Sequence, residues 1–228
     1  MNILSIDTSN QYCSIAIITE NNSANFHVEA KNLQSQLILK YIDTLLNDLN
    51  LELDQIDTMI FGAGPGGFTG VRLAISIVKG LSITLNKIPI YGLSSTLSIA
   101  YELHCKEKIN NVLVLQDARR DEFYYAQYTF SEDRINTVIS DSMIATTKFV
   151  LPTDAEAICG SGLELLNNFN AKSIPNYPTP NALYQGMLAK LLISNASISN
   201  FNHTGPNYIR NNVVQAPSKT NTLPISKK

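Results

Sequence analysis

The amino-acid sequence predicts an α/β protein in which mixed sheets are flanked by helices. Uniformly apolar runs at Met59–Phe61 and Val112–Leu115 are typical of buried strands, and longer segments with helical periodicity separate them. A short strand that ends in an aspartate and returns as a hairpin occurs twice, at Asp7 and at Asp117. This repeat indicates an internal duplication, although the residues of the two copies differ in detail.

Composition limits the classes of protein to which the chain can belong. With 228 residues, 44% of them hydrophobic, it can form one large domain or two small lobes. A net charge of −2 opposes an autonomous nucleic-acid binder. The cysteines Cys13, Cys105 and Cys159 have no CxxC spacing, so we expect reduced thiols and a cytoplasmic protein. No apolar run reaches about 18 residues, so we expect neither a signal peptide nor a membrane span.

Three strands and one helix are predicted on the N-terminal side of the buried run Met59–Phe61. Ile3–Ile6 is expected to be a strand, Tyr12–Thr19 its hairpin partner, and a third short strand surrounds Phe26 and Val28. Leu33–Leu49 has the periodicity of a helix with a wide apolar stripe. The sequence therefore predicts a hairpin, a third short strand and an amphipathic helix in the N-terminal part.

The helix predicted at Thr69–Asn86 is apolar around most of its circumference. Only Arg72, Ser76 and Lys79 form a narrow polar strip. A helix of this composition is buried on more than one side. A sheet would cover one side, and either the helix Leu33–Leu49 or a partner subunit would cover the other.

The second part of the chain begins near Asn111. A strand at Phe123–Phe130 follows the second apolar run, and the turn Gly160–Gly162 leads into a short helix. Asn181–Ile193 is predicted to be an amphipathic helix with Asn181 as its N-cap. We expect the following units: an N-terminal lobe at residues 1–105, a smaller lobe at 106–204, a segment at about 205–216 that packs back on the first lobe, and a disordered tail at 217–228.

A glycine-dense loop joins the strand Met59–Phe61 to the helix after it. Its glycines are Gly62, Gly64, Gly66, Gly67 and Gly70. A Walker A loop would need a lysine where Phe68 stands, and a dinucleotide loop would need an acidic residue about 20 positions further on, where none occurs. The loop could approach a phosphate, a nucleotide or another segment of protein. A tight turn without any ligand is the competing interpretation.

Motifs along nearly the whole chain resemble those of the TsaB family, also called YeaZ. From Asn2 to about Val214 they occur in the order of that family. They are MNILSIDTS, FGAGPGGFTGVRLAISIVKGL, YGLSSTL, LQDARRDEFYYAQY and PNYIRNN. The resemblance implies a duplicated two-lobe fold shared by actin, heat-shock chaperones and the acetate and sugar kinases.

The resemblance also implies a noncatalytic role in tRNA modification. Members of this family pair with TsaD, which transfers a threonylcarbamoyl group to N6 of the adenosine beside the anticodon, and a small ATPase, TsaE, joins them. The subunit has no cofactor of its own, and the complex uses ATP. Because the chain is acidic, we expect no dominant direct contact with the tRNA.

The resemblance implies that the helices on either side of the glycine loop form the partner surface. They would pair with the same helices of TsaD, or with a second copy of the chain in a homodimer when TsaD is absent. The residues expected near this interface are Leu39, Ile42, Leu46, Ile75, Lys79 and Ile83.

Metal chemistry is not expected in this chain. TsaD carries a metal site of the HxxxH kind, and the corresponding region here, Gly92–Ser98, contains no histidine. The three histidines, His27, His104 and His203, have no second histidine at the i+3 or i+4 position, so each is expected to be a surface residue. We therefore expect neither a metal site nor a protease site.

Several single residues leave two interpretations open. In the wider superfamily an aspartate at the place of Asp7 works near nucleotide phosphates, but we favour a cap of the hairpin turn. Asp117 and Arg119 could hold a turn or form a salt bridge between the lobes. Arg72 could extend to solvent, pair with an acid or contact a partner. The ending PNYIR is expected to pin the C-terminal segment to the body through its two larger polar side chains, Tyr208 and Arg210.

A small-molecule kinase of the same fold is the alternative function. It would use Asp7 and the glycine loop for a nucleotide, so it should bind ATP alone and lose activity in Asp7→Ala. A scaffold subunit should tolerate Asp7→Ala and fail when a charge is placed on the helix surface, for example in Ile75→Glu.

Overall fold

A computed structural model places the first sheet at the N-terminal end of the chain. The structure describes residues 1–30, 33–132, 134–166 and 178–210. The strand order in this sheet is β3-β2-β1-β4-β5. β1 pairs antiparallel with β2 and parallel with β4, so a hairpin stands beside parallel strands. The strands are β1 (Ile3–Asp7), β2 (Tyr12–Ile18), β3 (Ser23–Glu29), β4 (Thr58–Gly62) and β5 (Ile90–Leu93).

The second sheet repeats the topology of the first. Its strand order is β8-β7-β6-β9, where β6 pairs antiparallel with β7 and parallel with β9. The order β3-β2-β1-β4 in the first sheet has the same sequence of pairings. The duplication expected from the repeated aspartate hairpin is therefore confirmed. The strands are β6 (Asn111–Asp117), β7 (Glu122–Ser131), β8 (Arg134–Ala145) and β9 (Ala157–Cys159).

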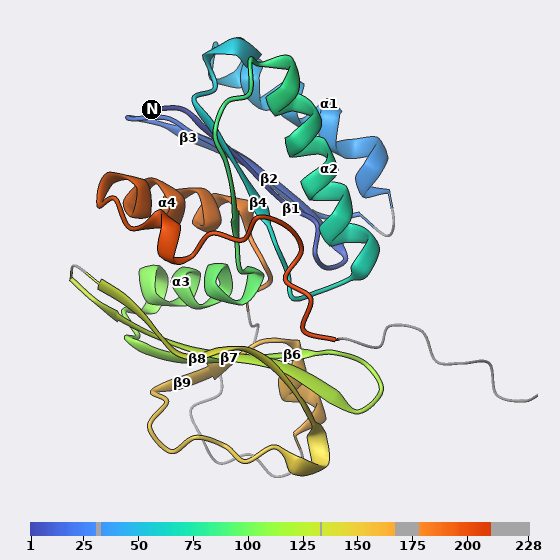
Figure 1. The fold of residues 1–228 in the computed structure, drawn as a ribbon, viewed down its shortest axis with the longest axis vertical. Coiled ribbons are helices and arrows are strands. Elements are labelled where there is room, and N and C mark those ends of the chain that lie inside the picture. Colours follow the sequence, from blue (N-terminus) through green and yellow to red (C-terminus); the bar gives the residue numbers. More distant parts are fainter. Residues whose placement is uncertain (31–32, 133, 167–177, 211–228) are drawn as a thin grey trace, which may run out of the picture.

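Helices form one layer outside the first sheet and one layer between the two sheets (Figure 1). α1 (Gln34–Asp48) and α2 (Phe68–Thr84) cover the outer face of the first sheet. α3 (Ser95–Glu107) and α4 (Ala182–Ser194) lie side by side between the sheets. The remaining helical turns are η1 (Leu53–Gln55), η2 (Thr146–Lys148), η3 (Ser161–Leu165) and η4 (Ile198–Asn200).

Alternation along the strands of the first sheet places a different hydrophobic core on each of its faces. In β1, Leu4 and Ile6 face α1 and α2, while Ile3 faces the layer between the sheets. The outer core also contains Ile38 of α1 and Val78 of α2. The central strands β1 and β4 are consequently buried on both faces, which explains why most of their residues are apolar.

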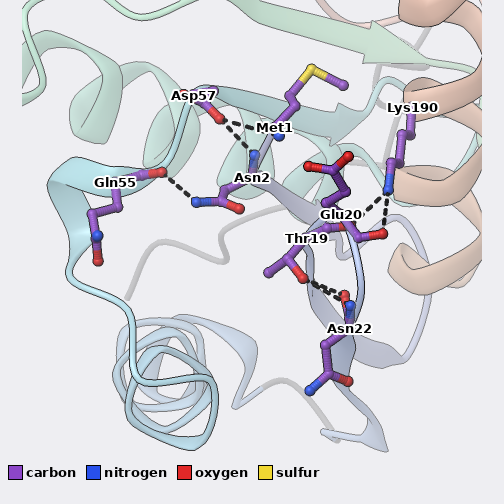
Figure 2. A network of polar contacts seen from close by, with 8 residues as sticks. All are labelled: Met1, Asn2, Thr19, Glu20, Asn22, Gln55, Asp57 and Lys190. Carbon is purple, nitrogen blue, oxygen red and sulfur yellow. Dashed lines mark hydrogen bonds and ion pairs between the residues drawn. The ribbon is translucent and has the colours of Figure 1, made fainter.

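Polar contacts attach α4 to the first sheet although the two are far apart in sequence. Asn181 caps α4 by accepting a hydrogen bond from the backbone of Leu183, as predicted. At the other end, Lys190 donates to the carbonyl oxygens of Thr19 (2.7 Å) and Glu20 (3.2 Å) in the β2–β3 turn (Figure 2). The backbone amide of Ala182 donates to the hydroxyl of Ser14 in β2 (2.8 Å), so the helix is tied to the sheet at both ends.

Most predicted elements occur within two residues of their expected ends, but α3 and the strands β5, β8 and β9 were not predicted. The short helix expected after Gly160 is the 3₁₀ turn η3. α4 lies in the range 106–204 that was expected to form the second lobe, yet it packs on the first sheet. The expected tail at 217–228 lies outside the described residues. No helix in the described part of the chain is both long and apolar enough to cross a membrane.

Candidate functional site

The glycine loop packs against the β1–β2 turn. The amide of Gly67 donates to the carbonyl oxygen of Ser9 (2.6 Å), and the Thr8 hydroxyl donates to the carbonyl oxygen of Gly70 (2.7 Å). A Cβ atom added at Gly66 or Gly70 would overlap the backbone oxygen of Ser9 or Thr8. The sequence left a phosphate, a nucleotide or another segment of protein as possible neighbours of this loop. The structure shows that the loop contacts another segment of the same protein.

Two further positions of the loop require glycine for different structural reasons. Gly64 has a φ of 90°, a conformation that residues with a Cβ atom rarely adopt. A Cβ atom at Gly62 would overlap the carboxyl group of Asp7. The glycine loop thus allows three elements to approach one another closely: β4, α2 and the turn after β1.

Asp7 lies at the centre of this junction and is buried. One carboxylate oxygen accepts hydrogen bonds from the backbone amide (2.8 Å) and the hydroxyl (2.6 Å) of Ser9. The other accepts from the hydroxyl of Ser95 at the start of α3 (2.8 Å). Burial raises the pKa of Asp7, while these hydrogen bonds act in the opposite direction. The hairpin-capping interpretation is supported, and Asp7 also connects β1 to α3.

Gln185 extends the same network to α4. With its side-chain amide oriented so that the nitrogen faces Asp7, Gln185 donates to the carboxylate (3.3 Å) and accepts from the amide of Gly62 (3.1 Å). Gln185 is completely buried. The space in front of Asp7 is therefore filled by side chains of α3 and α4.

The second hairpin forms a local turn. The backbone amide of Arg119 donates to Asp117 (2.7 Å), and its guanidinium pairs with the same carboxylate (3.0 Å). Of the two interpretations offered for this pair, the structure supports the turn, because both residues belong to one hairpin.

The segment after η4, residues 202–210, links the two halves of the molecule, and we call it the strap. Its His203 forms a bridge with Gly92 of β5, and the amide of Asn207 donates to Ala63 (2.8 Å). Arg210 then pairs with Glu122 and donates to the carbonyl oxygen of Ala118 (3.1 Å) in the second half. Arg210 therefore attaches the strap to the second half of the molecule.

Arg72 of α2 approaches Tyr208 of the strap. The guanidinium carbon of Arg72 lies 3.1 Å from the ring centre of Phe68 and 5.0 Å from that of Tyr208. These distances correspond to cation–π contacts. Tyr208 and Phe68 are each about half exposed, so this group forms part of the surface.

The histidines are less exposed than expected. His27 is half-buried between the hydroxyls of Ser14 (3.0 Å) and Thr179 (2.9 Å), and burial lowers its pKa. His104 stacks on Phe130. His203 is half-buried in the strap. Within the described ranges, no group of three or more His, Cys, Asp or Glu side chains is arranged to hold a metal ion.

The outward face of α1 and α2 is the remaining candidate site. Ile83 is 69% exposed on α2 and Leu39 is 56% exposed on α1. Lys79 is exposed as well, and a Cβ atom added at Gly80 would meet no atom within 4 Å. This face therefore combines large apolar side chains with a helix surface that another helix could approach closely.

Three of the residues expected near the interface face the opposite way. Ile42, Leu46 and Ile75 belong to the outer hydrophobic core, where they pack between the helices and the sheet. Ile75 is only 6% exposed. These three residues support the outward face from beneath and do not line it. The variant Ile75→Glu would bury a charge and unfold the protein, so it does not test a surface.

Other residues at these junctions escaped the sequence analysis. Asp141 of β8 is half-buried and accepts hydrogen bonds from Thr96 of α3 and Asn207 of the strap (2.7 Å). Tyr128 lies against the same carboxylate (3.5 Å). An isolated aspartate in a polar stretch gives no signal of burial, because its partners come from distant segments. Gln185 was missed for the same reason.

Comparison with known proteins identifies the family. The family model described as TsaD, tRNA N6-adenosine threonylcarbamoyltransferase, matches residues 27–213. The tRNA threonylcarbamoyladenosine biosynthesis protein TsaB of Haemophilus influenzae is 30% identical over 93% of this chain and 95% of that protein. The chain belongs to the TsaB family. The TsaB protein of Escherichia coli is 35% identical over 59% of this chain and 58% of its own length.

Solved structures of TsaB relatives have the same fold. YeaZ from Pseudomonas aeruginosa, 26% identical, matches 85% of this chain and 92% of its own with a TM-score of 0.76. A second Pseudomonas aeruginosa structure, described as an uncharacterized protein with similarity to peptidase YEAZ, is 25% identical and covers 92% of this chain and 99% of its own with a TM-score of 0.80. The predicted fold class is therefore confirmed.

Proposed function

We propose that the chain is a noncatalytic scaffold subunit in tRNA threonylcarbamoyladenosine biosynthesis, and that it pairs with TsaD. TsaD would transfer the threonylcarbamoyl group to N6 of the adenosine beside the anticodon, TsaE would join the complex, and the complex would use ATP in the cytoplasm. The observation that carries the proposal is the apolar outward face of α1 and α2, formed around Leu39 and Ile83.

The residues of α2 on this face have the spacing of a helix–helix seam. Leu73, Ser76, Gly80 and Ile83 are separated by three, four and three residues, and all are at least partly exposed. The small residues would let a partner helix approach closely, while burial of Ile83 would contribute about 1.5 kcal/mol or more. The match to the TsaD family model supports a partner that presents the same two helices. A second copy of this chain would take the same face in a homodimer.

The surroundings of Asp7 support the scaffold over the kinase alternative. A kinase would need this carboxylate to face a nucleotide and its metal ion. Here both carboxylate oxygens accept hydrogen bonds from Ser9 and Ser95, and α4 fills the space in front of them. The glycine loop is likewise occupied by the β1–β2 turn.

Reconstituted tRNA threonylcarbamoylation tests the proposal. The reaction contains TsaD, TsaE, ATP, tRNA and the enzyme that makes the threonylcarbamoyl adenylate, with and without this protein. We expect modification only when the protein is added, and neither modification nor ATP hydrolysis by the protein alone. Equal modification without the protein would refute the scaffold role, and tight ATP binding by the protein alone would support the kinase.

A charged residue on the outward face should weaken pairing with TsaD without destabilising the fold. We expect Ile83→Glu and Leu39→Glu to leave the melting temperature nearly unchanged, because both side chains are exposed, and to weaken association with TsaD by at least about tenfold. Val150→Glu is the matched control, since Val150 is 83% exposed in the second half. Association can be measured by analytical ultracentrifugation. If Val150→Glu weakened it as much as the other two, the assigned face would be wrong.

A further inference from the structure

A pocket of about 300 Å³ opens where the glycine loop, the β6–β7 turn and the strap meet. Its floor is apolar and buried, formed by Ala63, Val71 and Ala118. Phe68 and Tyr208 stand on its rim and are about half exposed. This pocket has no part in the pairing with TsaD proposed above.

Arginine is concentrated at this pocket. The chain has five arginines, and three of them, Arg119, Arg120 and Arg210, line the pocket. A fourth, Arg72, lies over the two aromatic rings of the rim. Among the residues that the structure describes, the lining contains no acidic residue and no lysine. Away from the pocket the basic residues are mostly lysines. Arginine, whose planar guanidinium group presents several hydrogen-bond donors, is therefore concentrated at this one place.

The donors of these arginines are only partly used. Arg119 pairs with Asp117, and Arg210 pairs with Glu122, but the buried Nε atom of Arg210 has no hydrogen-bond partner within the described part of the chain. Among the described residues, the side chain of Arg120 has neither an ion pair nor a hydrogen bond. A ligand with a carboxylate would therefore meet free guanidinium donors at the mouth of an apolar cavity.

We propose that this pocket binds an acidic segment of a partner protein, with one apolar side chain in the cavity and flanking carboxylates on the arginines. The lining is rich in aromatic side chains and arginine and poor in lysine, aspartate and glutamate. That composition is typical of the energetic centre of a protein–protein interface. The cavity has the volume of the smallest ligand pockets, which suits a single anchoring side chain.

The pocket is distinct from the outward face proposed for TsaD. It lies at the N-terminal end of α2, beside Phe68, whereas Ile83 lies 15 residues further along the helix, about 22 Å away. The inference does not rest on the scaffold role, and the variant Ile83→Glu should leave binding at the pocket unchanged. Failure of one proposal can thus be distinguished from failure of the other.

A peptide array provides the test. The probes are blocked pentapeptides with the pattern Glu-Asp-X-Glu-Asp, where X is each amino acid in turn, and the charge-reversed set Lys-Arg-X-Lys-Arg. The full chain is applied at low salt, and the affinity of the best peptides is measured by fluorescence anisotropy. We expect binding by acidic peptides with Phe, Leu, Met, Tyr or Trp at X, and none by the charge-reversed set.

Variants assign the binding to the pocket. Arg120→Gln should weaken it by about fivefold or more, because an exposed charge contact is lost. Arg134→Gln is the matched control, since it changes the arginine that lies away from the pocket, and it should change the affinity by less than about twofold.

Three results would overturn the proposal. They are no binding by any acidic peptide at about 1 mM, equal effects of Arg120→Gln and Arg134→Gln, and equal binding by every residue at X. Displacement of the best peptide by adenosine monophosphate or citrate at lower concentration, with the same dependence on Arg120, would instead assign the pocket to a small anion.

Discussion

Two aspartates at the junctions of this fold have uncharged hydrogen-bond partners. The buried Asp7 accepts from Ser9 and Ser95, and the half-buried Asp141 accepts from Thr96 and Asn207. In both cases burial raises the pKa, because removal from water disfavours the charged form. The free energy of unfolding therefore depends on whether each carboxyl group is protonated, and so on the pH.

The variant Asp141→Asn should change the pH dependence of stability. Since the folded pKa of Asp141 lies above its unfolded value, the wild type is favoured relative to the variant at low pH. This advantage should be lost as the pH rises through the folded pKa, by about 1.4 kcal/mol for each unit of pKa difference. Tyr128 and His203 face the same carboxylate.

Urea unfolding at a series of pH values from about 4 to 8 measures this difference. The unfolding free energy of the wild type minus that of the variant should fall with rising pH and then become constant. A difference that rises with pH would mean that Asp141 is stabilised as an anion.

At the scale of elements, α2 combines one face that cannot accept a Cβ atom with one that can. A Cβ atom at Gly70 would overlap the carbonyl oxygen of Thr8, whereas one at Gly80 would meet no atom within 4 Å. We expect Gly70→Ala to lower the unfolding free energy by about 3 kcal/mol or more, and Gly80→Ala to raise it by about 0.5–1 kcal/mol through helix propensity.

Thermal unfolding of the two variants at low protein concentration measures both effects. If Gly70→Ala were as stable as the wild type, the close packing of α2 on the β1–β2 turn would be wrong. A Gly80→Ala variant that is more stable alone but pairs less well with TsaD would support the outward face as the interface.

The predictability of each element depended on where its partners lie. α1, α2 and α4 were predicted because a one-sided or continuous apolar pattern is legible in a single segment. α3 was missed because Ser95, Thr96, Ser98 and Glu102 are buried polar residues that interrupt its apolar pattern. β8 was missed because most of its side chains are not buried.

The candidate site was predicted only in part, for a geometric reason. The sequence indicated that α2 carries more apolar surface than one sheet can cover, and the exposed Ile83 agrees with this. It could not show which side of each helix faces the sheet, because the phase of an apolar stripe is ambiguous when the helix is apolar nearly all round. Ile42, Leu46 and Ile75 were assigned to the surface for that reason.

At the scale of the whole molecule, the strap holds the two halves together. Arg210→Ala removes the ion pair with Glu122 and the hydrogen bond to Ala118, so we expect a loss of about 1–3 kcal/mol in strap stability. Hydrogen exchange at the amide of Asn207, which bonds to Ala63, should become about tenfold faster or more. Arg120→Gln is the control and should leave this exchange unchanged.

An unchanged exchange rate in Arg210→Ala would show that Asn207 and the bridge between His203 and Gly92 hold the strap without help from the second half. The strap would then belong to the first sheet alone.

The late position of α4 in the chain has a consequence for the synthesis of the protein. The inner face of the first sheet is covered by α4, whose residues follow the whole second sheet in the chain. A nascent chain that has left the ribosome only as far as β5 exposes Ile3, Ile18 and Ile60 without their cover. Because a chain grows by about 5–20 residues per second, this apolar face stays open for several seconds. We therefore expect chaperones to bind the first half until α4 has emerged.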